Sequence, residues 1–474
     1  MPRIVLRAPK TFEKAFGRIR GELDVPRSFP AEVQAEAELA TGTEAGQGAR
    51  IDARHLPLVA VDPPGATDLD QAFMAERVGD GYRVSYAIAD VGAFLAPGGV
   101  IDVEARRRGA TLYSPDTRTP LHPEVISEDR ASLLAGTEKP ALLWTIDLDG
   151  DALPIDWRLE RAIVRVDEAI SYAEAQSRVE AGADQRMMLL AAIGALRQDR
   201  EAERGGISLN LPAQEVVERN GSYSLEFDRS LPVEGWNAQI SLLTGIVAGQ
   251  TMIEAEVGVL RTLPPPFDDA LDRLRRTAEF LRLDWPSQTS YPDFVRSLTP
   301  NDARCNAFLL QAARSFRGAG YVGFDGEIPR YPEHGAIASV YSHVTAPLRR
   351  LVDRFGNEIL LALFADQRPP AWALEALDEL PSLMGQSKQR ESALERAMLD
   401  MTEALVLEHS VGEIFDGFVV SLDRKRDRAV VQIADPAIVS NISTEGRTLA
   451  ENVKLRLDSV DITERRVDFR VVEG

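Results

Sequence analysis

The stretch LVAVDPPGATDLDQAF, residues 58–73, is the most informative part of this chain. An apolar run ends at Asp62, and a Pro-Pro-Gly sequence then forces a sharp turn. Asp68 and Asp70 follow with a single leucine between them. If this segment is extended, the two-residue period of a strand places both carboxylates on one face and turns the leucine into the core. The sequence therefore predicts strand, turn and strand, with three aspartates close together.

Three carboxylates within nine residues repel one another, and the repulsion raises their pKa values unless a cation neutralises it. Magnesium selects hard oxygen ligands of this kind. Facing carboxylates that hold magnesium are also typical of phosphodiester hydrolysis, because the metal activates water and neutralises the phosphate. A calcium site or a solvated acidic loop fits the residues equally well, so composition alone leaves the chemistry open.

The segments around this stretch predict an α+β body over residues 51–410. Strands are indicated by LPLVAV, YRVSYAIADV and ALLWTIDLD between residues 56 and 165. Helical spacing follows at 186–203, 237–257, 267–282, 301–316 and 347–365, and again at 373–408 with an interruption near Pro381. A mixed sheet followed by a run of helices is the expected result.

Both ends of the chain differ from this body. Residues 1–50 predict a short basic unit with helices over 10–24 and 30–40, which is either a helix-turn-helix or simply two adjacent helices. Residues 411–474 predict a five-stranded barrel of OB type, because short alternating strands are separated by polar turns. Such barrels often bind single-stranded nucleic acid, whereas a structural barrel is the alternative. The candidates for base stacking there are Phe415, Phe418 and Phe469.

Composition is that of a globular protein of the reducing cytoplasm. The 474 residues include one cysteine, Cys305, which excludes an internal disulfide and a thiolate zinc cluster. No apolar run is long enough to span a membrane, so we expect no membrane association. The balance of 54 Lys and Arg against 74 Asp and Glu gives a net charge of −20, which argues against a polyanionic partner. Basic clusters at residues 1–20, 106–108, 349–350 and 424–426 still allow a basic channel, or are solvated surface.

Several separate blocks resemble the RNase II/RNase R family, whose catalytic part is the RNB domain. DPPGATDLDQ is similar to the family's DPPGAKDLDD, and YAIADVGAFLAPGGVIDVEARRRGATLYSPDTRTPLHP is similar to a block of nearly 40 residues in the same order. Downstream, YSHVTAPLRRLVDRF and ALERA also match, and the terminal barrel resembles the family's S1-type domain. The resemblance covers roughly residues 56–408 and implies a magnesium-dependent exoribonuclease that degrades single-stranded RNA processively from the 3′ end to nucleoside 5′-monophosphates.

The resemblance also implies site residues. Asp62, Asp68 and Asp70 fall on three of the four family aspartates that hold metal, while the fourth position is Gln71. An amide still offers a carbonyl oxygen but removes one negative charge, which should weaken a second metal. Asp70 occupies the position most important for the chemical step. Arg349 matches the catalytic arginine beside the active site, where a guanidinium can stabilise charge on phosphate oxygens.

Four further positions concern RNA binding. Tyr113 aligns with a tyrosine that stacks on a nucleotide near the 3′ end, and Glu395 matches a glutamate near the last nucleotides. Gln239 takes the place of a glutamate that contacts a ribose hydroxyl. Leu211 stands where relatives carry an aromatic clamp. For Tyr113 and Glu395, core packing and an exposed helix charge are the alternatives.

The resemblance implies magnesium, with manganese as an alternative, as cofactor and single-stranded RNA 3′ ends as partner, without an obligate protein partner or a membrane. Members of the family usually carry two cold-shock barrels before the catalytic domain, and 50 residues cannot hold one. We therefore expect a shorter channel and a smaller single-stranded overhang requirement. Because Gln71, Gln239 and Leu211 depart from the family pattern, an RNA-binding relative that has lost hydrolysis is the alternative function.

Overall fold

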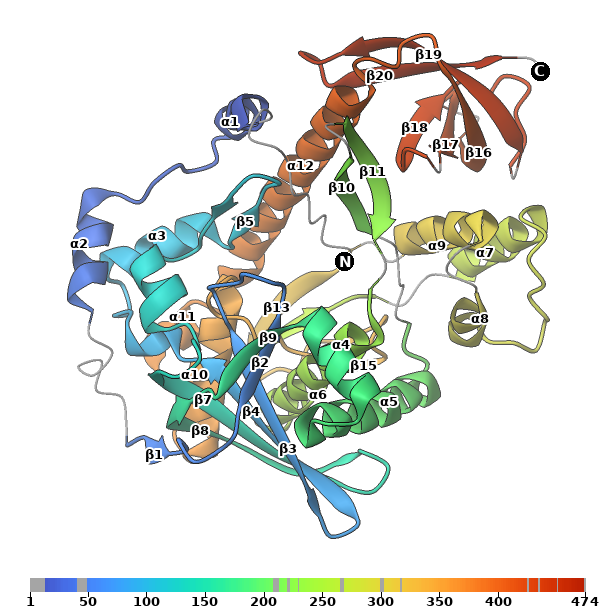
Figure 1. The fold of residues 1–474 in the computed structure, drawn as a ribbon. Coiled ribbons are helices and arrows are strands. Elements are labelled where there is room, and N and C mark those ends of the chain that lie inside the picture. Colours follow the sequence, from blue (N-terminus) through green and yellow to red (C-terminus); the bar gives the residue numbers. More distant parts are fainter. Residues whose placement is uncertain are drawn as a thin grey trace.

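The structure is a computed structural model of residues 1–474 (Figure 1). It describes residues 13–40, 49–207, 213–219, 222–228, 230–264, 268–298, 302–315, 318–423, 426–433, 435–449 and 451–472. Among these residues, no helix is both long and apolar enough to cross a bilayer.

A seven-stranded mixed sheet forms the centre of the body, in the strand order β1-β8-β7-β4-β3-β2-β9. Its strands are β1 (Ile51–Asp52), β2 (Val59–Asp62), β3 (Gln71–Val78), β4 (Gly81–Ala89), β7 (Glu138–Leu148), β8 (Pro154–Arg165) and β9 (Glu168–Ser171). The β1/β8 and β2/β9 pairs are parallel, and β2/β3, β3/β4, β4/β7 and β7/β8 are antiparallel. The three strands predicted from the sequence are therefore present as β2, β4 and β7 of one sheet, with β3 between β2 and β4.

Both faces of this sheet are buried, as the alternation in β4 shows. Val84, Tyr86 and Ile88 point into a core that contains residues of helices α5 (Gln185–Arg204) and α6 (Pro232–Glu254). Ala87 and Ala89 point to the opposite face, into a core that contains residues of α2 (Ala31–Leu39), η2 (Val91–Ala93), α3 (Val100–Arg108) and η3 (Val125–Arg130). Helices thus cover both sides of a mixed sheet, which confirms the predicted α+β class.

Each helical segment predicted from the sequence contains a helix, and the structure adds helices at 100–108, 172–181 and 291–297 that were not predicted. The helices are α1 (Glu13–Glu22), α2 (Ala31–Leu39), η2 (Val91–Ala93), α3 (Val100–Arg108), η3 (Val125–Arg130), α4 (Tyr172–Ala181), α5 (Gln185–Arg204), α6 (Pro232–Glu254), α7 (Asp268–Phe280), α8 (Tyr291–Ser297), α9 (Ala303–Ser315), α10 (Leu351–Phe364), α11 (Ala371–Glu375) and α12 (Leu380–Leu407). Pro381 lies in the first turn of α12, where its missing N–H costs nothing, so the predicted interruption is the gap between α11 and α12.

The shorter strands form two-stranded sheets: β5 (Leu112–Tyr113) with β6 (Arg118–Thr119), β10 (Ala213–Arg219) with β11 (Ser222–Asp228), β12 (Val257–Thr262) with β13 (Gly320–Asp325), and β14 (Glu333–His334) with β15 (Ser339–Val340). Helices α7 to α9 come between β12 and β13 in the sequence and lie to one side of the body (Figure 1). The β10/β11 hairpin was not predicted from the sequence.

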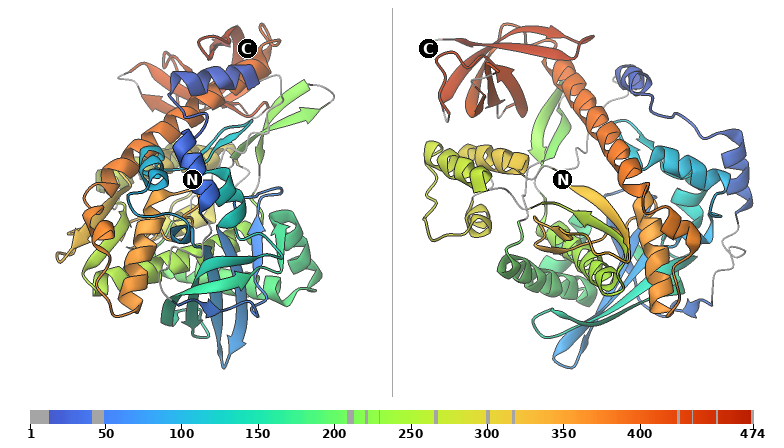
Figure 2. Two further views of the ribbon diagram at one scale, coloured as in Figure 1. Left: turned by 90° about the vertical axis from the view of Figure 1, so that its left-hand side faces the viewer. Right: turned by 180° about the vertical axis from the view of Figure 1, so that it is seen from behind.

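Helix α12 leads from the body to a terminal five-stranded sheet in the order β18-β17-β16-β19-β20 (Figure 2). Its strands are β16 (Ile414–Asp423), β17 (Arg428–Ile433), β18 (Ile438–Ile442), β19 (Asn452–Asp461) and β20 (Arg466–Val472). Since the end strands β18 and β20 also lie close together, the sheet curls into the predicted OB-like half-barrel. The rings of Phe415 and Phe469 pack edge to face with their centroids 5.8 Å apart. This contact is what the alternative of a structural barrel expects of the two residues.

The two predicted N-terminal helices are present but pack on different parts of the molecule. Phe16 and Ile19 of α1 pack against α12, while Val33 and Ala37 of α2 contribute to the core on one face of the central sheet. The helix-turn-helix interpretation stays a prediction.

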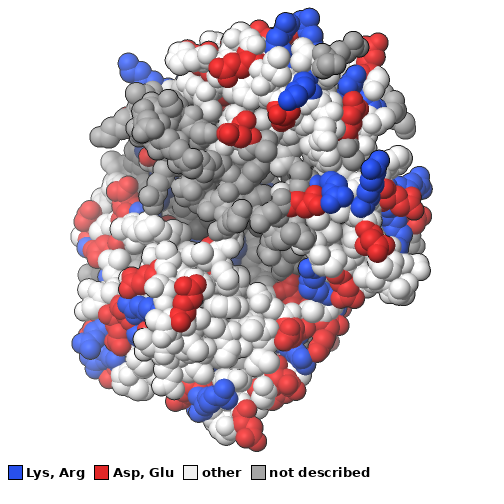
Figure 3. Space-filling model, turned by 45° about the vertical axis from the view of Figure 1, so that its right-hand side comes forward, with Lys and Arg blue, Asp and Glu red and all other residues white. Residues whose placement is uncertain are grey.

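The basic cluster at residues 106–108 is neutralised within the fold. Arg106 contacts Glu379, and Arg107 and Arg108 both bind Glu104. On the face shown in Figure 3, basic and acidic side chains are interspersed and neither sign forms one large patch. Each of these three guanidinium groups therefore has a carboxylate partner within the fold, while the side chain of Arg107 is still 59% exposed.

Candidate active site

The stretch of residues 58–73 lies at one end of the central sheet. Asp62 ends β2, and Asp68 and Asp70 lie just before β3. Leu69 is buried, its N–H donates to Ser132 Oγ at 2.9 Å, and its carbonyl accepts from Leu133 N at 3.0 Å. The intervening leucine is thus anchored in the core, as the two-residue period predicted.

Asp70 lies in a buried position between a backbone amide and a guanidinium. Its Oδ1 accepts from Leu348 N at 2.8 Å, and its Oδ2 accepts from Arg349 Nε at 3.1 Å. Burial raises the pKa of Asp70 to about 7, because the loss of solvation outweighs the favourable contacts with Arg349 and Leu348, and Asp353 and Asp68 add repulsion. The arrangement brings Asp70 and Arg349, which are far apart in the sequence, into one site.

Asp68 has different partners. Arg118 Nη1 lies 2.6 Å from Asp68 Oδ1, and the Tyr113 hydroxyl donates to Asp68 Oδ2 at 3.3 Å. Arg118 also binds Glu128, with Nη2 at 2.6 Å from Oε2. Arg118 was not predicted as a site residue, although it lies in the segment PDTRTP of the matching block, at the position paired with Tyr113 across β5 and β6.

The negative charge of Asp62 affects the buried Tyr86, which is also near Asp70. Tyr86, buried on β4, has a pKa raised well above its usual value, first by burial and then by the nearby charges of Asp62, Tyr172 and Asp70. A buried phenol therefore lies within electrostatic reach of both Asp62 and Asp70.

Gln71 contacts the segment that carries Arg349. Its Nε2 donates to the carbonyl oxygen of Thr345. Because a carbonyl only accepts hydrogen bonds, the amide must present its NH₂ group there, and a carboxylate in the same position could not replace it. The predicted role of Gln71 as a metal ligand stays a prediction.

Residues 344–350 form a well-held loop beside Asp70. Asp353 Oδ1 accepts from Ala346 N at 2.7 Å, Asn357 donates to Val344 O at 2.9 Å, and His122 Nε2 lies 3.2 Å from Pro347 O. Burial lowers the pKa of His122 to about 3, so its ring is neutral at ordinary pH. The neighbouring Arg350 forms an ion pair with Asp353.

The other predicted RNA contacts lie at varying depth. Tyr113 is 38% exposed beside Asp68, so one part of its ring is available to a ligand. Gln239 is buried on α6, where its Nε2 donates to Glu201. Glu395 is half-buried on α12, and burial followed by repulsion from Glu391 raises its pKa. Among the described residues, the hydrogen bonds of Asp68 and Asp70 go to Tyr113, Arg118, Leu348 and Arg349 rather than to Gln239 or Glu395. Leu211 lies outside the described residues.

The carboxylate oxygen atoms of the three aspartates are ligands that a divalent cation such as magnesium prefers. Asp62, Asp68 and Asp70 offer hard oxygen atoms, and the raised pKa of Asp70 indicates a buried negative charge that lacks compensation. Within the ranges that the structure describes, no three His, Cys, Asp or Glu side chains converge as a ready-made metal centre. Asp68 is held by Arg118 instead, so a cation that used Asp68 would compete with this guanidinium.

Cation binding is therefore expected to depend on pH. Metal binds the ionised carboxylate, so a proton must leave Asp70 when the pH is below about 7. The affinity should fall by about tenfold per pH unit below that value and change little above it. Titration calorimetry with Mg²⁺ in two buffers of different ionisation enthalpy should detect about one proton released at pH 6 and almost none at pH 8.5. Equal proton release at both pH values would contradict the assignment to Asp70.

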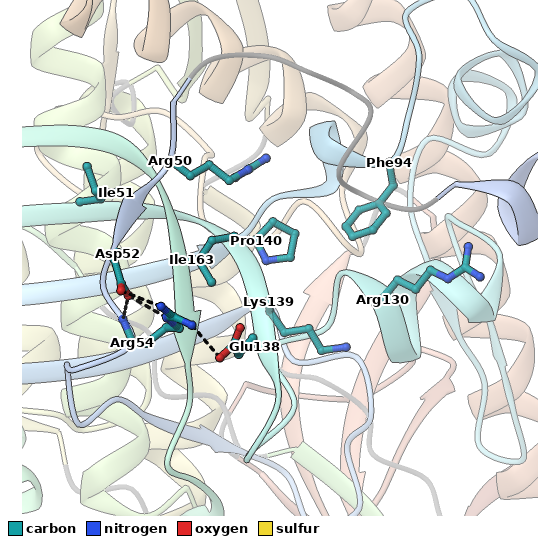
Figure 4. A pocket seen from close by; sticks show the side chains of 10 residues that line it. All are labelled: Arg50, Ile51, Asp52, Arg54, Phe94, Arg130, Glu138, Lys139, Pro140 and Ile163. Carbon is teal, nitrogen blue, oxygen red and sulfur yellow. Dashed lines mark hydrogen bonds and ion pairs between the residues drawn. The ribbon is translucent and has the colours of Figure 1, made fainter.

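A separate pocket of 530 Å³ lies beside β1 and the start of β7 (Figure 4). None of the predicted site residues lines it. Its four basic side chains all have partners: Arg54 binds Asp52 and Glu138, Arg50 binds Asp90, and Lys139 and Arg130 donate to backbone carbonyls. The pocket therefore offers no free cation among these residues for a phosphate, and the candidate site remains the one around Asp70.

Comparison with known proteins gives two family matches. The RNB domain model matches residues 50–366, and the model of the RNase II-type exonuclease C-terminal S1 domain matches residues 413–472. The exosome complex exonuclease RRP44 homolog A of Arabidopsis thaliana is 30% identical over 333 residues, which cover 66% of this chain and 35% of that protein. The curated relatives are matched over 34% to 60% of their own length.

Solved structures share the fold. RNase R of Mycoplasma genitalium in complex with ribose-methylated single-stranded RNA superposes with a TM-score of 0.86 at 17% identity, covering 96% of this chain and 77% of that chain. Yeast Ssd1, described as a pseudonuclease, superposes with a TM-score of 0.68 at 16% identity over 88% of this chain and 52% of that chain. The fold therefore occurs both with bound RNA and in a protein described as a pseudonuclease.

Proposed function

The chain belongs to the RNB family of RNase II-type exonucleases, and from that premise we propose that it hydrolyses single-stranded RNA from the 3′ end with a divalent metal, magnesium or manganese. We propose further that it acts processively and releases nucleoside 5′-monophosphates. The observation that carries the proposal is Asp70, a buried carboxylate held between Leu348 N and Arg349 with Asp68 nearby.

The residues of the site have separate proposed roles in metal binding, charge stabilisation and base stacking. Asp62, Asp68 and Asp70 would hold the metal, which when bound supplies an activated water and neutralises the phosphate. Arg349 uses Nε to bind Asp70, and its side chain is 35% exposed, so its remaining N–H groups can stabilise charge on the phosphate. The exposed ring of Tyr113 can stack on a base beside Asp68.

A 5′-labelled single-stranded RNA tests this proposal. With Mg²⁺, the wild-type protein should shorten it stepwise from the 3′ end and release mononucleotides, whereas a DNA of the same sequence should stay intact. Release of internal fragments would contradict an exonuclease, and a product of unchanged length would indicate a phosphatase.

A catalytically lapsed RNA-binding protein is the second candidate. It is favoured by the amide at Gln71, by the guanidinium of Arg118 on Asp68, and by the structural similarity to a pseudonuclease. Binding of RNA without shortening, in both Mg²⁺ and Mn²⁺, would support this candidate and contradict the first.

Substitution of Gln71 tests whether its hydrogen bond to Thr345 O holds the loop next to Asp70. Gln71→Glu keeps the shape of the side chain but replaces the NH₂ donor with an oxygen that faces Thr345 O. At saturating Mg²⁺ we expect turnover of RNA to fall by about tenfold, which corresponds to one lost hydrogen bond of about 1.4 kcal/mol.

The control for this variant is Gln34→Glu, the same change at an exposed position of α2. Turnover should be measured over a full Mg²⁺ titration, so that metal affinity and the chemical step are separated. An unchanged or higher turnover in Gln71→Glu, together with tighter Mg²⁺ binding, would instead support Gln71 as the fourth ligand position.

A further inference from the structure

The β5/β6 hairpin carries the two side chains that contact Asp68. Tyr113 ends β5 and Arg118 begins β6, and the two residues are paired across the hairpin. Tyr113 Oη and Arg118 Nη1 reach opposite oxygens of Asp68, at 3.3 and 2.6 Å. The position of this hairpin therefore sets what lies over Asp68.

The hairpin is too small to hold its own position. Each strand has only two residues, and the turn between them is closed by a hydrogen bond from Ser114 N to Thr117 O at 2.8 Å. Isolated two-stranded hairpins are marginally stable at best, and one this short needs support from its surroundings.

Helix α1 supplies such support at the tip of the hairpin. The guanidinium of Arg20 binds Asp116 through two hydrogen bonds, from Nη1 to Oδ1 at 2.6 Å and from Nη2 to Oδ2 at 2.9 Å. The two side chains are only 14% and 7% exposed. A bidentate pair that is largely shielded from water is stronger and more directional than an ordinary surface ion pair.

Helix α1 is itself anchored on two other sides. Phe16 and Ile19 are buried against Leu112 of the hairpin and against α12. At the barrel end, Arg18 donates to the carbonyls of Ile462 and Thr463 in the turn between β19 and β20, and Glu22 binds Arg465 in the same turn. Figure 2 shows α1 beside the barrel end of α12. The helix is thus fixed to α12 and to the terminal half-barrel, and presents Arg20 to the hairpin.

We propose that Arg20 is a positioning residue for the nucleotide site, because its pair with Asp116 fixes the hairpin that places Tyr113 and Arg118 beside Asp68. This inference rests on the proposed RNA-binding function of the site. Arg20 binds Asp116 at the tip of the hairpin, so its effect on the site passes through the hairpin backbone.

The test uses a short single-stranded RNA with 2-aminopurine near its 3′ end, bound to the full chain in EDTA. Stacking on Tyr113 should quench the fluorescence of 2-aminopurine in the wild type. Arg20→Ala and Asp116→Ala should each reduce the quenching and weaken the affinity by about tenfold, the strength expected of a shielded bidentate pair. The double variant should be no worse than either single variant, and Arg20→Lys should lie in between, since lysine keeps the charge but loses the fork.

The matched control is Lys14→Ala, which removes one positive charge from an exposed position of the same helix. It should leave quenching of the short RNA unchanged. Wild-type quenching in Arg20→Ala, with the fold confirmed by circular dichroism, would overturn the proposal, and so would additive losses in the double variant.

Because the readout needs no hydrolysis, it is independent of catalysis. A protein that binds RNA and shows the Arg20–Asp116 coupling but cannot cleave would contradict the proposed nuclease function alone. A protein that cleaves RNA without this coupling would contradict the positioning role alone.

Discussion

Asp70→Asn is expected to lower the rate of RNA hydrolysis by about a thousandfold or more. Asparagine keeps the size of the side chain but removes the negative charge that a divalent metal requires, and metal catalysis contributes several kcal/mol to phosphodiester cleavage. A loss of about 4 kcal/mol corresponds to about a thousandfold. The rate should be measured in single turnover, with the protein in excess over 5′-labelled RNA and Mg²⁺ saturating for the wild type.

Two controls make this result specific. Binding of the same RNA in EDTA should stay within about threefold of the wild type, because Asp70 contacts Leu348 and Arg349 rather than the open surface. Asp80→Asn makes the same change at an exposed turn beyond the far end of β3 and should leave the rate unchanged. Substantial cleavage by Asp70→Asn, above about one-tenth of the wild-type rate, would show that another group binds the catalytic metal.

The same substitution has a second consequence, for stability. A carboxyl whose folded pKa is raised from 3.8 to about 7 costs the metal-free fold nothing below pH 4, and the cost grows as the pH rises to about 7. The full difference corresponds to about 4 kcal/mol. We therefore expect Mg²⁺ to raise the melting temperature of the wild type more at pH 8 than at pH 5, and to have little effect on Asp70→Asn. An equal rise at both pH values would place the stabilising cation elsewhere.

The sequence predicted the parts of the site that depend on local pattern. Asp62, Asp68 and Asp70 follow from a strand, a turn and a two-residue period, and Leu69 is buried as that period requires. The main helices and the half-barrel follow from apolar spacing and turn residues. These features are decided by neighbours in the chain, so one sequence is enough to find them.

The sequence could not predict contacts that only the folded chain creates. Gln71 reaches Thr345, 274 positions away, and Arg20 reaches Asp116 across 96 positions. Neither residue belongs to a periodic pattern, and an arginine on a short helix reads equally well as a solvated charge. Arg118 lay inside a recognised block, but its contact with Asp68 depends on a hairpin of two-residue strands that propensity cannot detect.

Arg349→Ala is expected to reduce turnover by about a hundredfold to a thousandfold, because removing one preorganised donor to a developing negative charge typically costs that much. The variant should also change the pH dependence. Arg349 lowers the pKa of Asp70, so its removal should move that pKa above about 7 and weaken Mg²⁺ binding at neutral pH. The rise of turnover with pH at limiting Mg²⁺ should therefore shift to higher pH, and part of the activity should return as the pH is raised.

Arg349→Lys separates the two roles of this guanidinium. A lysine keeps a positive charge near Asp70 and should restore much of the pH profile, but it lacks the fork that reaches a phosphate while still binding Asp70. We therefore expect near-wild-type pH dependence with turnover still reduced at least tenfold. Arg158→Ala, on β8 and 63% exposed, is the matched control and should leave both quantities unchanged. If Arg349→Lys restored turnover as well, charge alone would explain the requirement and the geometric role of the guanidinium would be refuted.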